Sequence, residues 1–230
     1  MEQLDVWSLI QAGLFEEACK KADVEYEETK DVFLLRNKVY ALLHLEKYQE
    51  CILLSHKIID LRNGDTDSDF IFCGIANWLI GNKSEAVQLW HNGENCKYTD
   101  AAGGVELQVI LYFASIRLTD ETLRSGVVKT LKKVLKSKRS ISWPGPLGKY
   151  ILGEITEEVL FANISNIPIL KERQLCQANF AIAIKELEKG NTIEYKRKLQ
   201  ESIGYGSSSY LEQVFYLAKG ELKLSYMITN

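Results

Sequence analysis

Apolar residues recur along this chain at spacings of three and four, the pattern of amphipathic helices that bury one face. The first run consists of Leu4, Trp7, Ile10 and Leu14, with a break at Gly13 near its end. A second run starts at Phe15 directly after the break, and similar runs follow toward the C-terminus. Short helices separated by such breaks predict helical hairpins.

A local motif occurs three times near the N-terminus: a break, then an aromatic or similar residue, acidic residues and a small residue. The three copies are Gly13-Leu14-Phe15-Glu16-Glu17-Ala18, Glu46-Lys47-Tyr48-Gln49-Glu50-Cys51 and Gly81-Asn82-Lys83-Ser84-Glu85-Ala86. The small residue recurs at intervals of 33 and 35. This is the period of stacked helical hairpins, so the motif predicts a repeat array.

The hairpin pattern continues beyond the third copy. Helices are expected over residues 105–118 and 120–136, before Trp143-Pro144-Gly145-Pro146, whose two prolines cannot lie inside a helix. We expect an N-terminal part (1–140) and a C-terminal part (141–230) of one continuous array. The predicted fold is an all-α, right-handed superhelical array of about six antiparallel hairpins, with a closing helix at residues 208–223.

The third hairpin carries the clearest signature. Phe70, Gly74, Gly81, Ala86 and Trp90 stand at the bulky, small, turn, small and bulky positions of a tetratricopeptide unit. Gly74 and Ala86 would let two helices approach closely. The chain therefore resembles the tetratricopeptide-repeat superfamily, which implies a concave groove that binds protein.

A second resemblance covers roughly 80 residues of the C-terminal half. It rests on Trp143, Leu152-Gly153-Glu154-Ile155, Glu172, Cys176, Asn179-Phe180, Gly190-Asn191, Leu199, Glu212, Ala218 and Glu221-Leu222. In this order they resemble the bacterial new-lipoprotein-I-like repeat proteins. That resemblance implies an adaptor, although Ala181-Ile182-Ala183 stands where the family has a glycine and the lipoprotein leader is absent.

Repeat offsets predict which side chains line the concave groove. The predicted partner-binding residues are Trp7, Arg36, Tyr40, His44, Ile71, Ile75 and Trp78. Trp, Tyr and Arg dominate protein-interface hot spots, which favours a helix or a folded domain as the partner. The alternative for Ile71, Ile75 and Trp78 is that they pack against the adjacent hairpin, because aliphatic stripes usually belong to a core.

Charge is unevenly distributed around a net value of −3. Residues 1–31 are acid-rich, with Glu16, Glu17, Asp23, Glu25, Glu27, Glu28 and Asp31. The stretch 129–139 is basic, with Lys129, Lys132, Lys133, Lys136, Lys138 and Arg139. Both are expected to be solvated helix faces. A docking surface for an acidic protein or RNA is the alternative for the basic stretch, but no aromatic residue is interleaved to stack bases, so nucleic acid is not favoured.

The chain has few residues of the types that usually carry out catalysis. His44, His56 and His91 belong to no metal or nucleophile motif, and the five cysteines are scattered without a CxxC. The run Gly204-Tyr205-Gly206-Ser207-Ser208-Ser209 lacks the strand and lysine of a phosphate loop, and is expected to be a flexible connection. We therefore expect no catalytic residues, no metal, no cofactor and no small-molecule substrate.

The N-terminus shows no targeting leader and no apolar stretch reaches membrane-span length, so a cytoplasmic protein without a membrane partner is expected. The favoured function is a non-catalytic adaptor that binds a protein partner through its concave face. Two alternatives stay open: an immunity protein that neutralises a bacterial toxin by direct binding, and a helical-repeat protein that binds nucleic acid.

Overall fold

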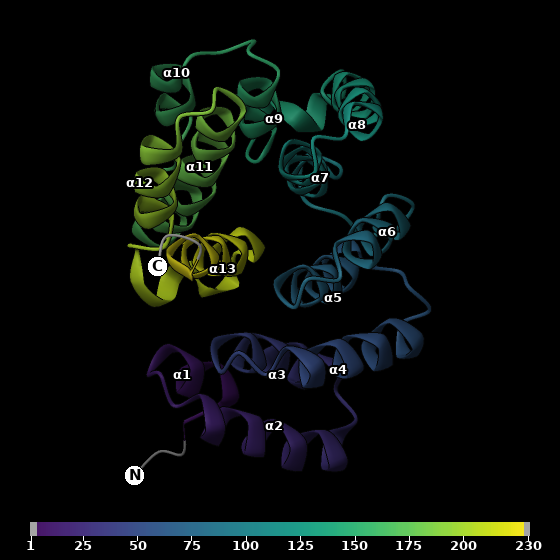
Figure 1. Cartoon of the computed structure of the whole chain (residues 1–230). Helices are drawn as coiled ribbons and strands as arrows, with labels where there is room; N and C mark the ends of the chain where they lie inside the picture. The colour runs from purple at the N-terminus through teal and green to yellow at the C-terminus, as the bar shows by residue number, and fades with distance from the viewer. Residues whose placement is uncertain (1–3, 228–230) are drawn as a thin grey trace. The chain divides into compact units, whose positions relative to one another are not determined.

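Helices and no strands make up the regular secondary structure of this protein in the computed structural model, which describes residues 4–227 and, of these, the side chains up to residue 224 (Figure 1). No strand occurs in that range, so the predicted all-α class is confirmed. None of the helices within it has the length and hydrophobicity that a membrane span requires. The chain divides into two compact units, Met1–Lys97 and Tyr98–Asn230.

The N-terminal unit consists of three consecutive helical hairpins. Each first helix packs against the second helix that follows it, and each hairpin packs against the next. The helices are α1 (Val6–Gln11), α2 (Phe15–Thr29), α3 (Val32–His44), α4 (Tyr48–Leu61), α5 (Asp67–Leu79) and α6 (Lys83–Gly93).

The repeated sequence motif is the turn inside each of these hairpins. Gly13, Glu46 and Gly81 have φ values of 77°, 57° and 94°, in the left-handed region. In each turn the next residue donates its N–H to a carbonyl five positions back, as Leu14 does to Leu9 at 2.9 Å. This is the Schellman arrangement that ends many helices. The motif therefore marks a helix stop followed at once by a helix start.

The same turn ends the first helices of the C-terminal unit. Thr119, Gly153 and Gly190 have φ values of 54°, 72° and 76°. The following residues, Asp120, Glu154 and Asn191, donate N–H to the carbonyl five positions back at 2.9 Å in each case. The hairpin unit thus continues beyond the three copies that the sequence shows.

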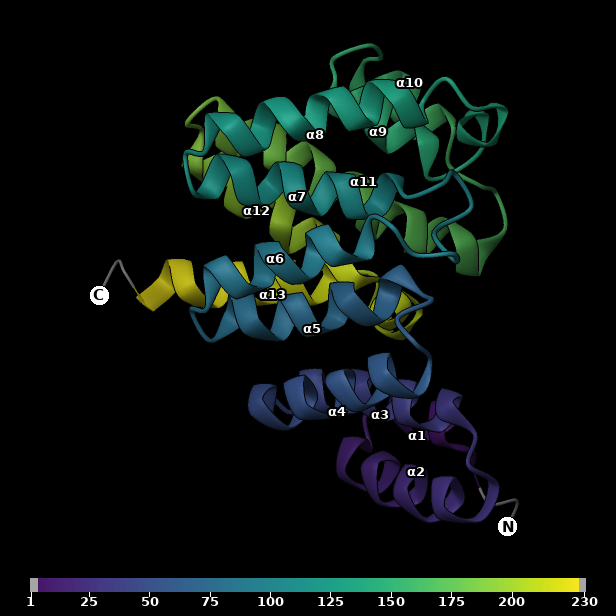
Figure 2. The ribbon, with the colours of Figure 1, turned by 90° about the vertical axis from the view of Figure 1, so that its right-hand side faces the viewer.

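The C-terminal unit contains seven α-helices and two short 3₁₀ helices within its described part, up to residue 227. In Figure 2, α7 and α8 lie antiparallel, side by side. The elements are α7 (Val105–Arg117), α8 (Glu121–Val134), η1 (Lys138–Ile141), α9 (Gly145–Ile151), α10 (Glu157–Ala162), α11 (Pro168–Glu188), α12 (Thr192–Ser202), η2 (Gly206–Leu211) and α13 (Gln213–Met227).

The boundary between the compact units lies before the expected joint at residues 140 and 141. Helix α7 packs against α8, α9 and α11, and the rings of Phe113 and Phe180 are 5.5 Å apart between α7 and α11. Helices from both sides of Trp143-Pro144 therefore share one core. Pro146 lies in the first turn of α9, where a missing N–H costs nothing.

Two expected elements differ in their bounds. The basic stretch 129–139 is not one helix, because α8 ends at Val134 and η1 begins at Lys138. The closing helix begins at Gln213 and not at 208, since η2 occupies residues 206–211. The expected flexible connection is anchored: Asn179 donates to the Tyr205 hydroxyl at 3.0 Å and Ser209 donates to the Gly206 carbonyl at 2.7 Å.

Gly74 makes room for a tryptophan. A Cβ atom at this position of α5 would lie 2.2 Å from Nε1 of Trp90 on α6. Trp90 is fully buried, and its Nε1 donates to the Ile71 carbonyl at 3.2 Å. The small residue was expected in this hairpin because of close helix packing, and the structure shows that the indole of Trp90 occupies the space.

Candidate protein-interaction surface

Three aromatic side chains from the first helices of the N-terminal hairpins form a row. The ring centroids of Trp7 (α1) and Tyr40 (α3) are 5.9 Å apart, and those of Tyr40 and Phe72 (α5) are 5.0 Å apart. Both pairs are edge-to-face, the favoured arrangement of aromatic rings. Trp7 and Tyr40 are half-buried, whereas Phe72 is buried. The row anchors two of the predicted site residues.

Arg36 lies one turn before Tyr40 on α3. Its Nε and Nη2 donate to the two carboxylate oxygens of Asp69 on α5 at 2.8 and 2.6 Å. Burial alone would lower the pKa of Arg36, but the hydrogen bonds and the charge of Asp69 raise it above its usual value. Its guanidinium carbon also lies 5.3 Å from the ring centroid of Phe33. A planar, two-point ion pair therefore holds Arg36 in one orientation.

His44 ends α3. Its imidazole stacks on the ring of Phe15 from α2, with centroids 4.3 Å apart and an interplanar angle of 5°. The stack fixes the ring at the turn between α3 and α4. His44 is half-buried, so part of it reaches solvent.

Ile71, Ile75 and Trp78 are buried, with at most 1% of their surface exposed. The ring of Trp78 packs 5.6 Å from that of Trp90, and the Lys83 ammonium lies 3.8 Å from its centroid. A side chain this deeply buried meets no partner in this conformation. The core alternative agrees with their burial, so these three residues lie outside the exposed surface of the unit.

We call Phe33, Arg36, Tyr40 and His44, together with Trp7, the α3 face. The four residues of α3 follow spacings of three and four, so they share one side of the helix. Leu35, Val39 and Leu42 point the other way and are buried. Phe33 was not among the predicted site residues, although 61% of it is exposed. Phe33 lies one turn before Arg36 on the same side of the helix, and this spacing is the sequence signal that could have added it to the predicted site.

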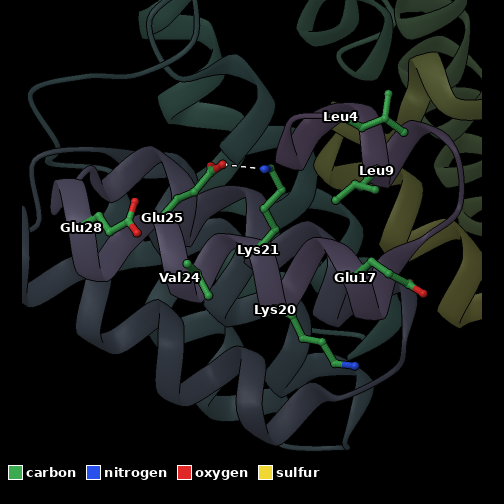
Figure 3. A pocket seen from close by; sticks show the side chains of 8 residues that line it. All are labelled: Leu4, Leu9, Glu17, Lys20, Lys21, Val24, Glu25 and Glu28. Carbon is green, nitrogen blue, oxygen red and sulfur yellow. Dashed lines mark ion pairs between the residues drawn. The ribbon is translucent and has the colours of Figure 1, made fainter. Parts of the chain in front are cut away.

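A shallow pocket of about 650 Å³ lies on the outer side of α1 and α2 (Figure 3). Leu4, Leu9 and Val24 supply its apolar part. Charged side chains surround them, and Lys21 and Glu25 form an ion pair of 2.8 Å. No group of this pocket suggests chemistry beyond contact with another surface.

Half of the eight acidic side chains in residues 4–31 form ion pairs within the unit. Glu16 pairs with Lys47 at 2.9 Å, Asp23 with Lys38 at 2.6 Å and Glu27 with Lys30 at 2.5 Å. Charges neutralised within the unit contribute little to an acidic field. The solvated-face interpretation of this segment therefore fits better than an acidic docking surface.

Four of the five cysteines are buried, and none forms a disulfide within the described chain. Burial raises the pKa of Cys51 and Cys73 to about 12 and that of Cys19 to about 11. The reactive species is the thiolate, so these thiols are inert at neutral pH. Within residues 4–227, no group of three His, Cys, Asp or Glu side chains could hold a metal ion.

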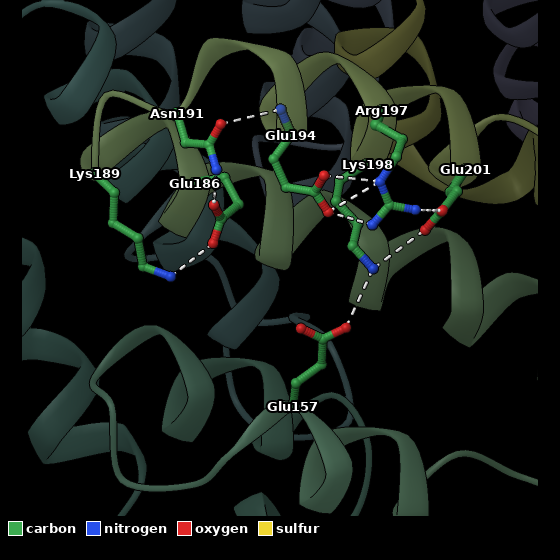
Figure 4. A network of polar contacts seen from close by, with 8 residues as sticks. All are labelled: Glu157, Glu186, Lys189, Asn191, Glu194, Arg197, Lys198 and Glu201. Carbon is green, nitrogen blue, oxygen red and sulfur yellow. Dashed lines mark hydrogen bonds and ion pairs between the residues drawn. The ribbon is translucent and has the colours of Figure 1, made fainter.

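A polar network joins α10 to α12 in the C-terminal unit (Figure 4). Lys198, whose side chain is 9% exposed, pairs with Glu157 of α10 at 3.1 Å and with Glu201 at 3.2 Å. Arg197 pairs with Glu194 and Glu201 on the surface of α12. Glu157 thus has a structural partner in Lys198.

A search against models of known protein families finds no match for this chain, and a search of curated proteins finds none either.

Proposed function

We propose that this protein is a non-catalytic adaptor that binds a protein partner through the α3 face. The observation that carries the proposal is the exposure of Phe33 beside the fixed guanidinium of Arg36 and the half-buried rings of Tyr40 and Trp7. Aromatic and arginine side chains dominate binding energy at protein interfaces. Rings and a guanidinium already held in place lose little freedom on binding.

We further infer that the hairpins stack as a right-handed array of the tetratricopeptide kind. Support comes from the left-handed turn that ends α1, α3, α5, α7, α9 and α11. In a stack of this kind the first helices line one surface. The aromatic row from α1 through α3 to α5 is what that arrangement would produce.

A cytoplasmic location is part of the proposal. Its support is the state of the cysteines, all of which are free thiols. Thiols persist in reducing compartments, whereas disulfides accumulate in oxidising ones.

The test places a photo-crosslinking phenylalanine analogue at Phe33 in the full chain, expressed in its native cells. Irradiation is expected to trap a protein partner at this position. The matched control carries the analogue at Leu53 on α4, an apolar residue of the same unit that is 72% exposed. It is expected to trap nothing in common with the Phe33 probe.

The trapped partner then tests the other members of the α3 face. Phe33→Ala and Trp7→Ala are each expected to weaken its binding by about thirty-fold or more, which corresponds to the loss of about 2 kcal/mol that defines an interface hot spot. Leu53→Ala should leave binding unchanged. Equal trapping at both probe positions, or no trapping at Phe33, would overturn the proposal.

A further inference from the structure

A dense run of positive charge lies at the end of α8. Six cations gather there, which we call the basic patch: Lys129, Lys132, Lys133, Lys136, Lys138 and Arg139. All six are exposed, and within residues 4–227 none of them forms an ion pair. By contrast, Lys21, Lys30, Lys38 and Lys47 of the N-terminal unit all have acidic partners.

No acidic side chain is available nearby in the sequence to neutralise the basic patch. The stretch from Ser125 to Gly153 contains no aspartate and no glutamate. Unpaired like charges repel one another and destabilise the folded chain. An arrangement that keeps them together therefore indicates an external anionic partner.

The fold holds the basic patch on a defined surface. Val127 and Leu131 of α8 are buried, and a Cβ atom on Gly148 of α9 would lie 3.1 Å from Leu131. Because α7 packs along the apolar side of α8 and Gly148 of α9 lies against Leu131, the lysines at spacings of three and four face solvent. The basic side of the helix is thus fixed by the packing of its apolar side.

The 3₁₀ helix η1, which follows α8, is also held in place by specific contacts. The buried Ser140 donates to the carbonyls of Leu135 and Ser137 at 2.9 and 2.7 Å. A Cβ atom on Gly145 would lie 1.8 Å from the Ser140 carbonyl oxygen, so the chain passes very close to α9 here. These contacts hold Lys138 and Arg139 next to the end of α8. They also present Ile141, which is 68% exposed.

We propose that the basic patch and Ile141 form a docking site for an anionic lipid surface. Clusters of four to eight lysines and arginines on an amphipathic helix are the recognised feature of proteins that bind acidic phospholipids. An exposed isoleucine beside them adds an apolar side chain that can enter the interface. Peripheral attachment needs no membrane-spanning helix, so this proposal departs from the expectation of no membrane partner.

The side chains of the patch favour lipid over nucleic acid. Ser125–Gly153 contains no Asn, Gln or His to read base edges. Trp143, the aromatic residue nearest to the cations along the sequence, is half-buried and donates its Nε1 to Gln177 at 2.5 Å. An aromatic held in this way provides no stacking platform for bases. Five of the six cations are lysines, which act as point charges and not as planar forks.

The test measures co-sedimentation of the full chain with vesicles of phosphatidylcholine alone or mixed equally with phosphatidylglycerol. Wild type is expected to bind only the anionic vesicles, and less as salt increases. Lys132→Glu with Lys136→Glu should weaken binding by about ten-fold or more, given the contribution of each cation near a charged surface. Ile141→Ser should weaken it by about five-fold, with little dependence on salt.

The matched control is Lys20→Glu with Lys171→Glu, which changes net charge equally at two exposed lysines that have no ion-pair partner in residues 4–227. It should bind anionic vesicles as wild type does. Circular dichroism checks that each variant is folded. The proposal is overturned if wild type ignores anionic vesicles at low salt, or if the control loses as much as the patch variant. It is also overturned if single-stranded RNA or polyglutamate, supplied at the same charge concentration, binds more tightly than the vesicles.

Discussion

The indole of Trp90 lies against the backbone of Gly74, at the place where any other residue would carry its Cβ atom. Nε1 of Trp90 and that Cβ would be only 2.2 Å apart. The α5–α6 hairpin therefore requires glycine at this position for space, and not for backbone freedom.

Replacing Gly74 with alanine should destabilise the N-terminal unit by about 2 kcal/mol. The methyl group displaces a fully buried indole and its hydrogen bond to Ile71, which outweighs the gain of alanine in helix propensity. Urea unfolding followed by tryptophan fluorescence measures this, because Trp7, Trp78 and Trp90 all lie in this unit. An unchanged midpoint would show that Trp90 can move at no cost.

Replacing Gly126 of α8 with alanine is expected to stabilise the protein, unlike the replacement of Gly74. Apart from its chain neighbours and the backbone of its own helix, no atom lies within 4 Å of a Cβ placed there, and the residue is exposed. The C-terminal unit should therefore gain roughly 0.5 to 1 kcal/mol from the restricted unfolded chain and better helix propensity. Urea unfolding followed by circular dichroism at 222 nm would measure it. A loss of stability would mean that α8 is less regular in solution than described.

Trp78 and Phe33 should respond differently to truncation. Trp78→Ala should cost about 3 to 5 kcal/mol, since its side chain is 1% exposed and packs on Trp90. Phe33→Ala should change stability by less than about 0.5 kcal/mol because the ring is largely in solvent. Thermal and urea unfolding of the two variants would measure both changes in stability. Similar losses in both would remove Phe33 from the proposed surface.

Glu188 should make the C-terminal unit sensitive to acid. Burial raises its pKa, but Lys185 at 2.5 Å and the Tyr112 hydroxyl at 2.7 Å outweigh this, so the pKa lies below its usual value. A carboxyl group with a depressed pKa stabilises the fold above its unfolded pKa of about 4.3, and this stability disappears as pH falls through the lower folded value.

Glu188→Gln is therefore expected to be about 1 to 2 kcal/mol less stable than wild type at pH 7. The difference should shrink as the pH falls below about 4, where the wild-type carboxyl is neutral as well. Urea unfolding at a series of pH values, followed by circular dichroism, provides the measurement. A difference independent of pH would show that the charge of Glu188 is not what stabilises this contact.

Alkylation should distinguish the thiols of the N-terminal unit. Cys51 and Cys73 are fully buried with pKa values of about 12, so iodoacetamide at pH 8 should label them only as the unit unfolds. Cys96 is partly exposed and should react faster, although its pKa is raised to about 11. Peptide mass spectrometry measures the three rates. Rapid labelling of Cys51 in native protein would contradict its burial.

The sequence by itself determined the all-helical class and the turns inside the N-terminal hairpins. Gly13 and Gly81 mark left-handed helix stops through local backbone geometry, which needs no knowledge of distant residues. Glu46 and Thr119 make the same turn without glycine, and only the repeat position of Glu46 indicated it.

Only the tertiary structure decided which predicted site residues stay at the surface. The repeat offsets predicted that Arg36 and Ile71 both line the groove. In the structure one side of α3 is exposed to solvent, whereas every residue of α5 from Ile71 to Trp78 is buried. The ion pair between Arg36 and Asp69 and the row through Trp7, Tyr40 and Phe72 join residues about thirty positions apart. Exposure and such contacts depend on what packs against each helix, and spacing along one helix does not contain that information.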